Sequence, residues 1–286
     1  MMHVTLNALA LAYVVRPLPT LSGEVARAAT SRAVPVTMMV DPESSDFDMS
    51  LLASRIKDIR SAPKPESVRL FNLDSMCPGQ CLEFDIPQAF ADTLEQLQAA
   101  DTAIVMVGRD RLRLLSHGVE CTVERLEKRS DGSAAVALVA GRYCEIVDVG
   151  EDEGSRWLGQ AGTVRWKSLD GTAPEEQPTP AVVERAEALE ALVVEWIRLV
   201  RTTGRERQPG QIERVLQDIG PIPEATRPSA RALWIAGLIN PLPGLGVALE
   251  IRPACLTAET ADMKLQVIEM GIKDSIERLK QAGAPF

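Results

Sequence analysis

The sequence is poor in the residue types on which most catalytic sites depend. Only two of its 286 residues are histidines, His3 and His117, so no second histidine is available to His117 for a metal triad or a catalytic one. His117 precedes Gly118, which is typical of a turn. The glycine-rich stretch Pro243–Gly246 lacks the lysine and the hydroxyl of a phosphate-binding loop, and no such loop occurs elsewhere. We therefore predict a protein that is not an enzyme and that binds no metal or cofactor.

Cysteine usage indicates a reducing compartment. The chain has five cysteines, an odd number, and no paired Cys-x-x-Cys motif, so neither a disulfide framework nor a zinc knuckle is indicated. Single buried thiols are the expected role. One alternative stays open at Cys77 and Cys81, which flank the Pro78-Gly79 dipeptide and are close enough in sequence to form a redox-active disulfide.

Negative charge exceeds positive charge in this chain. It has 40 Asp and Glu residues against 31 Lys and Arg residues, which gives a net charge of −9 and a pI near 5.0. This balance argues against a general nucleic-acid binder, because such proteins normally have a basic face. No apolar run reaches the ~18–20 residues that a membrane-spanning helix needs, so no membrane span is predicted.

The first part of the chain, residues 1–41, differs from the remainder. It has an apolar run at Val4–Val15, arginines among Ser, Thr and Ala residues, and Glu24 as its only acid before position 41. Basic, hydroxyl-rich and acid-poor N-termini are typical of organelle transit peptides. We expect a plastid (chloroplast) targeting segment, with the mitochondrion as the alternative address and a disordered tail without a targeting role as the other alternative. Residues 42–67 follow as a linker with a short helix at Asp48–Ser61.

Strand-like runs dominate the next part of the chain. Val68–Leu73 and Cys81–Ile86 flank the Pro78-Gly79 turn, and the second run alternates apolar and polar residues. The Asp131-Gly132 turn is the strongest hairpin signal in the chain. A short helix is expected at Phe90–Leu97, and further strands at Thr102–Val107, Gly118–Leu126, Ala134–Val139, Gly141–Val149 and Trp157–Trp166. Short strands in this number indicate a small, mostly antiparallel β-barrel.

A helical period replaces the strand period after a Gly/Pro-rich linker at Ser168–Pro180. Apolar residues then recur every three to four positions, as on helices with one buried face. Four helices are expected. The first begins at Ala181 and is ended by Gly204, and the others span Ile212–Ile219, Ala230–Asn240 and Glu259–Ala282. The predicted fold class is therefore α+β, with a barrel subdomain in residues 68–170 and a helical bundle half in residues 171–286.

Several short motifs, in this order along the chain, resemble the Lon protease N-terminal domain family. They are Leu70–Asp74, Pro78-Gly79, Leu82–Ile86, Ile239–Pro243 and the long last helix at Met263–Lys280. The resemblance covers roughly residues 68–280 and implies a PUA-like β-barrel followed by a helical half. It implies a stand-alone form of the domain, because the ATPase module and the protease domain of full Lon proteases have no counterpart in the sequence.

Members of this family bind unfolded or exposed apolar protein segments and hand them to an attached machine. Without such a machine, the resemblance implies a non-catalytic protein- and peptide-binding domain, related to proteolysis, that acts as an adaptor or chaperone-like factor in an organelle. Its expected partners are such segments, with a protease or an assembly machine as a further candidate. Large aromatic side chains commonly anchor bound proteins, and the candidates here are Phe90, Tyr143, Trp157 and Trp166.

RNA binding stays open as a second class of function, because PUA-like barrels elsewhere recognise RNA. Arg109, Arg111 and Arg113 form the only basic cluster of the predicted barrel, and their alternate spacing would place them on one face of a strand. The acidic total charge and the lack of interleaved aromatic residues argue against this alternative.

Overall fold

The computed structural model describes residues 65–110, 113–152, 160–169, 178–206, 208–240 and 250–282. The chain has two compact units, Met1–Lys57 and Asp58–Phe286, and every described residue belongs to the second unit. The predicted targeting segment and the helix at Asp48–Ser61 lie outside the described residues, so they stay predictions, as does the plastid address.

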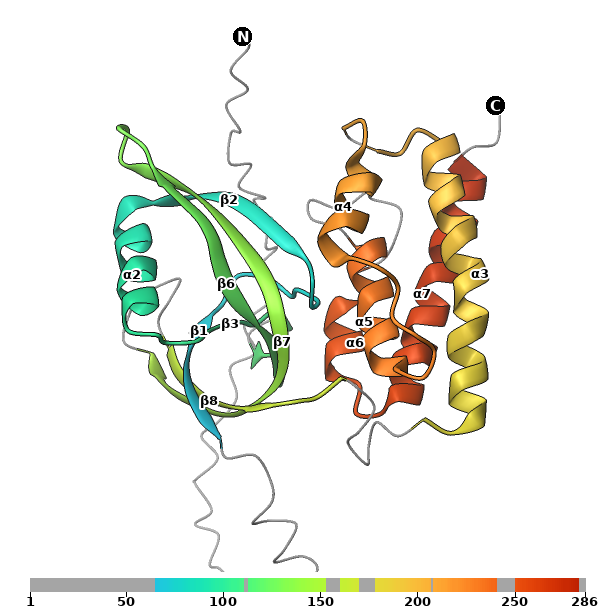
Figure 1. The fold of residues 1–286 in the computed structure, drawn as a ribbon, viewed down its shortest axis with the longest axis horizontal. Helices are drawn as coiled ribbons and strands as arrows, with labels where there is room; N and C mark the ends of the chain where they lie inside the picture. Colours follow the sequence, from blue (N-terminus) through green and yellow to red (C-terminus); the bar gives the residue numbers. More distant parts are fainter. Residues whose placement is uncertain are drawn as a thin grey trace, which may run out of the picture. The chain divides into compact units, whose positions relative to one another are not determined.

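Eight strands precede most of the helices in the described chain (Figure 1). The strands are β1 Glu66–Phe71, β2 Cys81–Pro87, β3 Ile104–Met106, β4 Arg109–Asp110, β5 Arg113–Leu114, β6 His117–Lys128, β7 Ser133–Asp152 and β8 Gln160–Trp166. The helices are α2 Gln88–Ala99, α3 Pro180–Thr202, α4 Gln211–Ile219, α5 Pro228–Ile239, α6 Arg252–Thr257 and α7 Ala261–Ala282. All four predicted helices of the second half are present, while α6 was not predicted.

Six strands form one mixed sheet in the order β2-β7-β6-β3-β1-β8, and β7 also pairs with β8. The pairings therefore run from β7 through β6, β3, β1 and β8 back to β7, which gives a barrel-like ring. Only β1 and β3 are parallel among the described pairs, so the α+β class and the mostly antiparallel sheet are confirmed. Strand β2 is not part of this ring and is an edge strand, because it pairs with β7 alone among the described strands.

The long strand β7 connects the two ends of this sheet. The strands predicted at Ala134–Val139 and Gly141–Val149 are two halves of β7, because Gly141 does not interrupt it. The first half pairs with β2 and the second half with β8. The predicted turn before β7 is confirmed: Gly132 has a φ of +82°, and Asp131 Oδ1 accepts hydrogen bonds from the Ser133 N–H and hydroxyl, at 3.0 and 2.6 Å.

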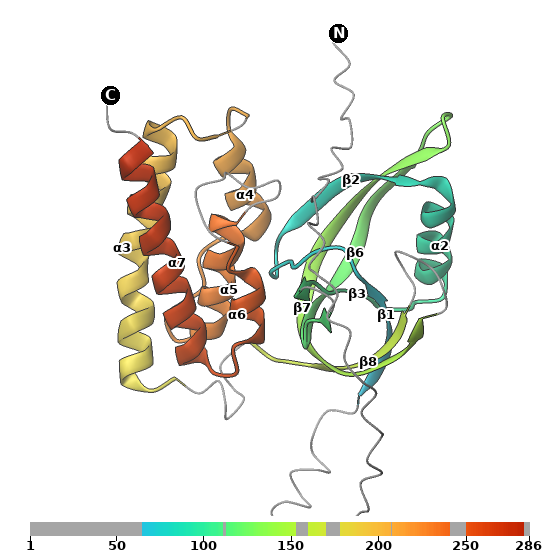
Figure 2. The same ribbon diagram turned by 180° about the vertical axis from the view of Figure 1, so that it is seen from behind.

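In the helical half, α3 and α7 run side by side and parallel to each other (Figure 2). The indole N–H of Trp196 donates to Ser275 Oγ at 2.7 Å. Nearer the start of both helices, Arg185 of α3 pairs with Asp262 of α7. The third helix of this group, α5, is buried along nearly its whole length, as a helix apolar on all sides should be.

One hydrophobic core joins the sheet to the helices. The main buried cluster contains Phe71 and Phe90 from the sheet half together with Trp196, Leu233 and Ile268 from the helical half. A smaller cluster includes Val68, Leu70, Val105, Cys144 and Val164. It lies on the opposite face of β1 and β3, because its residues alternate with those of the main cluster along these strands. The helices therefore share buried area with the strands instead of standing as a separate bundle.

Gly118 in β6 should be intolerant of a side chain. A Cβ atom there would lie 2.6 Å from the Met106 carbonyl oxygen and 2.9 Å from Val105 Cγ1, and the backbone atom cannot easily move. We expect Gly118→Ala to lower the free energy of unfolding by roughly 1–3 kcal/mol, the usual range for overpacking.

The matched control is Gly141→Ala in β7, where the nearest atom to an added Cβ is 3.7 Å away. This change should leave the free energy of unfolding within about 0.5 kcal/mol of the unmodified protein. Urea unfolding followed by circular dichroism measures both. Equal stabilities of the two variants would contradict the packing described for the β3–β6 pair.

Candidate functional site

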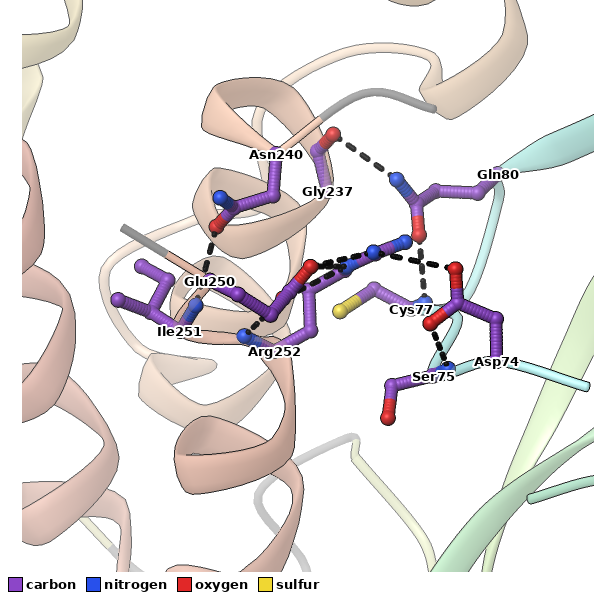
Figure 3. A network of polar contacts seen from close by, with 9 residues as sticks. All are labelled: Asp74, Ser75, Cys77, Gln80, Gly237, Asn240, Glu250, Ile251 and Arg252. Carbon is purple, nitrogen blue, oxygen red and sulfur yellow. Dashed lines mark hydrogen bonds and ion pairs between the residues drawn. The ribbon is translucent and has the colours of Figure 1, made fainter. Parts of the chain in front are cut away.

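The loop between β1 and β2 packs directly against the helical half (Figure 3). Its last residue, Gln80, is buried and makes two hydrogen bonds with its side-chain amide. Oε1 accepts from the Cys77 backbone N–H at 2.8 Å, and Nε2 donates to the Gly237 carbonyl of α5 at 3.0 Å. A Cβ on Gly237 would lie 3.3 Å from Gln80 Cγ, so the glycine permits this close approach. One amide thus connects the loop to α5.

Arg252, the first residue of α6, completes this junction from the helical side. Its side chain is 1% exposed, and it pairs with Glu250 at 2.5 Å and with Asp74 of the β1–β2 loop at 3.5 Å. Burial disfavours the charged guanidinium, but the hydrogen bonds and the charge of Glu250 outweigh it, and the pKa of Arg252 is raised. Nη1 is buried with no hydrogen-bond partner among the described residues. The guanidinium therefore links the two halves, since it pairs with Asp74 on one side and with Glu250 on the other.

A second group of contacts crosses the junction at Tyr143 of β7. Its hydroxyl donates to the Leu256 carbonyl of α6, and the His117 ring stacks on it with centroids 5.3 Å apart. The ammonium group of the buried Lys264 in α7 lies 5.8 Å from the Tyr143 ring centroid. His117 is in β6 and half-buried, so the turn predicted for it is wrong. Burial lowers the pKa of His117.

The predicted aromatic anchors lie in different environments, and the structure does not bring them together at one site. Phe90 and Tyr143 are buried, and Phe90 packs on Phe71 with centroids 5.2 Å apart, which makes both core residues and not exposed anchors. Trp166 is half-buried: its N–H donates to Glu66 at 2.6 Å, and the Arg142 guanidinium lies 3.9 Å from its ring centroid. Trp157 lies outside the described residues.

The arginine cluster predicted on one strand face is arranged differently. Arg109 is in β4 and Arg113 is in β5, and these two strands form a small antiparallel hairpin in which Asp110 pairs with Arg113. Both arginines are exposed, while Arg111 lies outside the described residues. The strand-face prediction is wrong because Arg109 and Arg113 lie on two different strands, and RNA binding itself stays a prediction.

Sequence reasoning missed an apolar surface on α7. Met263 and Met270 are 47% and 69% exposed, and they lie on the same side of the helix because seven residues make nearly two turns. Val267, half-buried, lies between them. We call Met263, Val267 and Met270 the methionine stripe. The sequence pattern that could have revealed it is a second row of apolar residues on the same helix, next to the row of buried residues that includes Leu265, Ile268 and Ile272.

The described residues offer no cluster of three His, Cys, Asp or Glu side chains that could hold a metal ion. In the same ranges no helix is both long and apolar enough to cross a bilayer. The predicted redox pair is present as two free thiols, Cys77 fully buried and Cys81 half-buried. Burial raises the pKa of Cys81 to about 11, with the charges of Asp218 and Glu83 adding to it, and burial also raises that of Cys77.

Loss of the Gln80 amide should destabilise the whole protein. Gln80→Leu leaves the Cys77 N–H and the Gly237 carbonyl buried without partners, at a cost of roughly 1–3 kcal/mol for each group. The matched control is Gln98→Leu, since Gln98 is exposed and its side chain makes one hydrogen bond, at 3.4 Å, to the described residues. Urea unfolding should show a large loss for the first variant and about 0.5 kcal/mol or less for the second. A small loss in both would mean that the junction does not depend on this amide.

The cysteines should react with iodoacetamide in a fixed order. At a pH of ~8, a thiol with a pKa of about 11 is ionised in about one molecule in a thousand, so Cys81 should react slowly and the four buried cysteines more slowly still. Raising the pH by one unit should speed Cys81 labelling about tenfold, because the thiolate fraction rises tenfold. Peptide mass spectrometry measures the labelling, with urea-unfolded protein as the control. A Cys77–Cys81 disulfide in the native protein would contradict this assignment.

Comparison with known proteins agrees with the fold described above. No protein-family model and no curated protein matches the sequence. A solved structure of the N-terminal domain of the Lon protease of Mycobacterium avium complex is similar, with a TM-score of 0.50, 17% identity, and coverage of 73% of this chain and 99% of that domain. A Lon N-terminal domain protein from Xanthomonas campestris gives a TM-score of 0.44 and 16% identity, and covers 70% of this chain and 95% of that chain. The likeness to the mycobacterial domain shows that this chain has the fold of the Lon N-terminal domain.

Proposed function

We propose that this protein is a non-catalytic binding protein that captures unfolded or exposed apolar protein segments and acts as an adaptor or chaperone-like factor. The fold supports this proposal, since a similar domain forms the N-terminal part of a protease, an enzyme whose substrates are polypeptides. The sequence resemblance to the same family supports it independently, because it rests on motifs and not on the arrangement of the strands.

The observation that carries the proposal is the methionine stripe on α7. Met263 and Met270 expose large apolar side chains on a chain whose net charge is −9. Methionine is unbranched and polarizable, and it adapts to irregular partners, so it recurs on surfaces that bind many different segments. The remaining apolar residues of α7, among them Leu265, Ile268 and Ile272, are buried in the core and hold the helix in place.

Substitution of the stripe should weaken binding without unfolding the protein. We expect Met263→Lys/Met270→Lys to raise the Kd for a permanently unfolded polypeptide, such as a reduced and carboxymethylated protein, by about tenfold, because apolar anchors carry most of the binding energy. Fluorescence anisotropy of the labelled polypeptide measures the Kd. The unfolding midpoint should change little, since both side chains are exposed.

The matched control adds the same positive charge on a different helix. Gln96→Lys/Gln98→Lys changes two exposed side chains of α2 and should leave the Kd within about twofold of the unmodified protein, as surface changes away from an anchor do. If both double variants bind equally well, or if the unmodified protein binds no unfolded polypeptide, the proposed function is wrong.

A further inference from the structure

Strand β2 has an edge that no other described strand covers. Hydrogen bonds at its two ends fix the direction of its backbone groups: the Gln80 carbonyl accepts from Ala140 N–H at 2.9 Å, and Gln88 N–H donates to the Gly132 carbonyl at 3.1 Å. Because this direction alternates in an antiparallel pair, the even-numbered residues of β2 face β7. The N–H and C=O groups of Cys81, Glu83 and Asp85 therefore point away from β7, and none of them has a hydrogen-bond partner within the described part of the chain.

The two faces of this edge differ in character. Leu82 and Phe84 lie on the face that meets the core and are only half-buried, with the Phe84 ring stacked on Phe71 at a centroid distance of 6.2 Å. Glu83 and Asp85 lie on the opposite face and are exposed. A strand added to β2 would therefore meet apolar side chains on one face and carboxylates on the other.

Acidic side chains outnumber basic ones beside the edge, with Glu83, Asp85, Glu124 and Asp218 against Arg125, Arg129 and Arg214. Glu83 and Asp85 pair with Arg125 and Arg129 at 2.8 and 3.0 Å, but all four side chains are close to half exposed or more, and such exposed pairs contribute little. Asp218 of α4 lies nearby. Its pKa is raised by burial first and then by the negative charges of Glu124 and Glu83. Basic side chains on an incoming segment would be attracted here.

A second copy of this chain is a poor occupant of the same edge. In antiparallel pairing of β2 with itself, registers centred on Glu83, Phe84 or Asp85 place two carboxylates directly opposite each other, and like charges in that position are destabilising. Pro87 at the end of the strand has no N–H to donate. Acidic residues and a proline are the devices that protect an edge from self-association, and they do not exclude a partner of opposite charge.

We infer that the outer edge of β2 binds an extended protein segment as an added antiparallel strand, and that the preferred segment alternates apolar and basic residues. The basic residues lie opposite Cys81, Glu83 and Asp85, and the apolar residues lie beside Leu82 and Phe84. Main-chain hydrogen bonds supply affinity and the alternating side chains supply specificity, as in other strand additions. The inference rests on the proposed function in that the occupant is a polypeptide, but it adds a binding site distinct from the methionine stripe.

The backbone register gives a sharp test on the unmodified full-length protein. The probe is a labelled peptide of about nine residues with alternating Val and Lys, and its charge control replaces Lys by Glu. Antiparallel pairing directs the Lys N–H groups to β2, because residues opposite each other exchange both hydrogen bonds. N-methylation of the lysines should therefore abolish binding, while N-methylation of the valines should leave the Kd nearly unchanged. Equal effects of the two methylations, or loss with the valines only, would overturn the inference.

A matched pair of protein variants tests the same edge from the other side. Glu83→Pro removes one outward N–H without breaking a hydrogen bond to β7, which an edge strand tolerates, and it should weaken binding of the Val-Lys peptide at least about tenfold. Glu83→Ala removes the charge but keeps the N–H, and should weaken it only about two- to threefold. The unfolding midpoint of each variant reports its folding. If Glu83→Pro is unstable, the methylated peptides still decide the question.

The two binding sites can be separated experimentally. Glu83→Pro should lose the Val-Lys peptide and keep most of its binding to the unfolded polypeptide, while Met263→Lys/Met270→Lys should show the reverse. A protein that binds the unfolded polypeptide but not the Val-Lys peptide would overturn the strand addition and leave the proposed function standing. Binding of the peptide without binding of the polypeptide would contradict the proposed function alone.

Discussion

The arrangement of the two halves depends on one buried amide, that of Gln80. Its side chain ties the β1–β2 loop to itself through the Cys77 N–H and to α5 through the Gly237 carbonyl. An amide can do both because it carries a donor and an acceptor on one planar group. The nearby Arg252 adds charge to the same junction through Asp74 and Glu250. Hydrophobic burial stabilises the contact between the halves but is not directional, so it does not determine which residues meet. These hydrogen bonds do.

This constraint determines the surroundings of β2. The loop that Gln80 fixes brings Gly79 against α4, where a Cβ atom would lie 3.1 Å from Ile219 Cα. The strand that follows pairs with β7 on one side, and α4 lies beside its beginning. The open edge of β2 therefore has a defined position next to the helices. The methionine stripe lies on α7, a helix that packs on α5, so both candidate binding surfaces belong to elements that the junction positions.

Much of the fold could be predicted because its elements follow simple periods. Cys81–Ile86 alternates and became β2, and the three-to-four spacing of the last helix was correct to within two residues. Helix α6 was not predicted because six residues are too few to show a helical period of apolar residues. The sequence predicts two strands separated at Gly141, but β7 continues through this glycine because β6 pairs with β7 both before and after it.

The candidate sites were harder to predict for a different reason. The contacts that form the junction join residues far apart in the sequence: Gln80 with Gly237, Arg252 with Asp74 and Tyr143 with Leu256. A local sequence pattern cannot predict such contacts. Alternation assigned Tyr143 to a strand, but it could not tell that the helices would cover that strand. The same limit applies to the methionine stripe, because exposure depends on what packs nearby and not on the sequence of α7 alone.

The parallel pairing of α3 and α7 has a consequence for how the chain reaches this structure. Helices joined by a short connection are antiparallel, so a parallel pair requires the chain to travel back first, and here α4, α5 and α6 make that return. The contact between Trp196 and Ser275 therefore closes a long loop, whereas the β6–β7 hairpin closes a short one. From loop-closure entropy and contact order, we expect the hairpin to form early in folding and the α3–α7 contact to form late. The part of the apolar face of α3 that α7 covers, which includes Trp196, is therefore covered only after α7 has been synthesised and has folded.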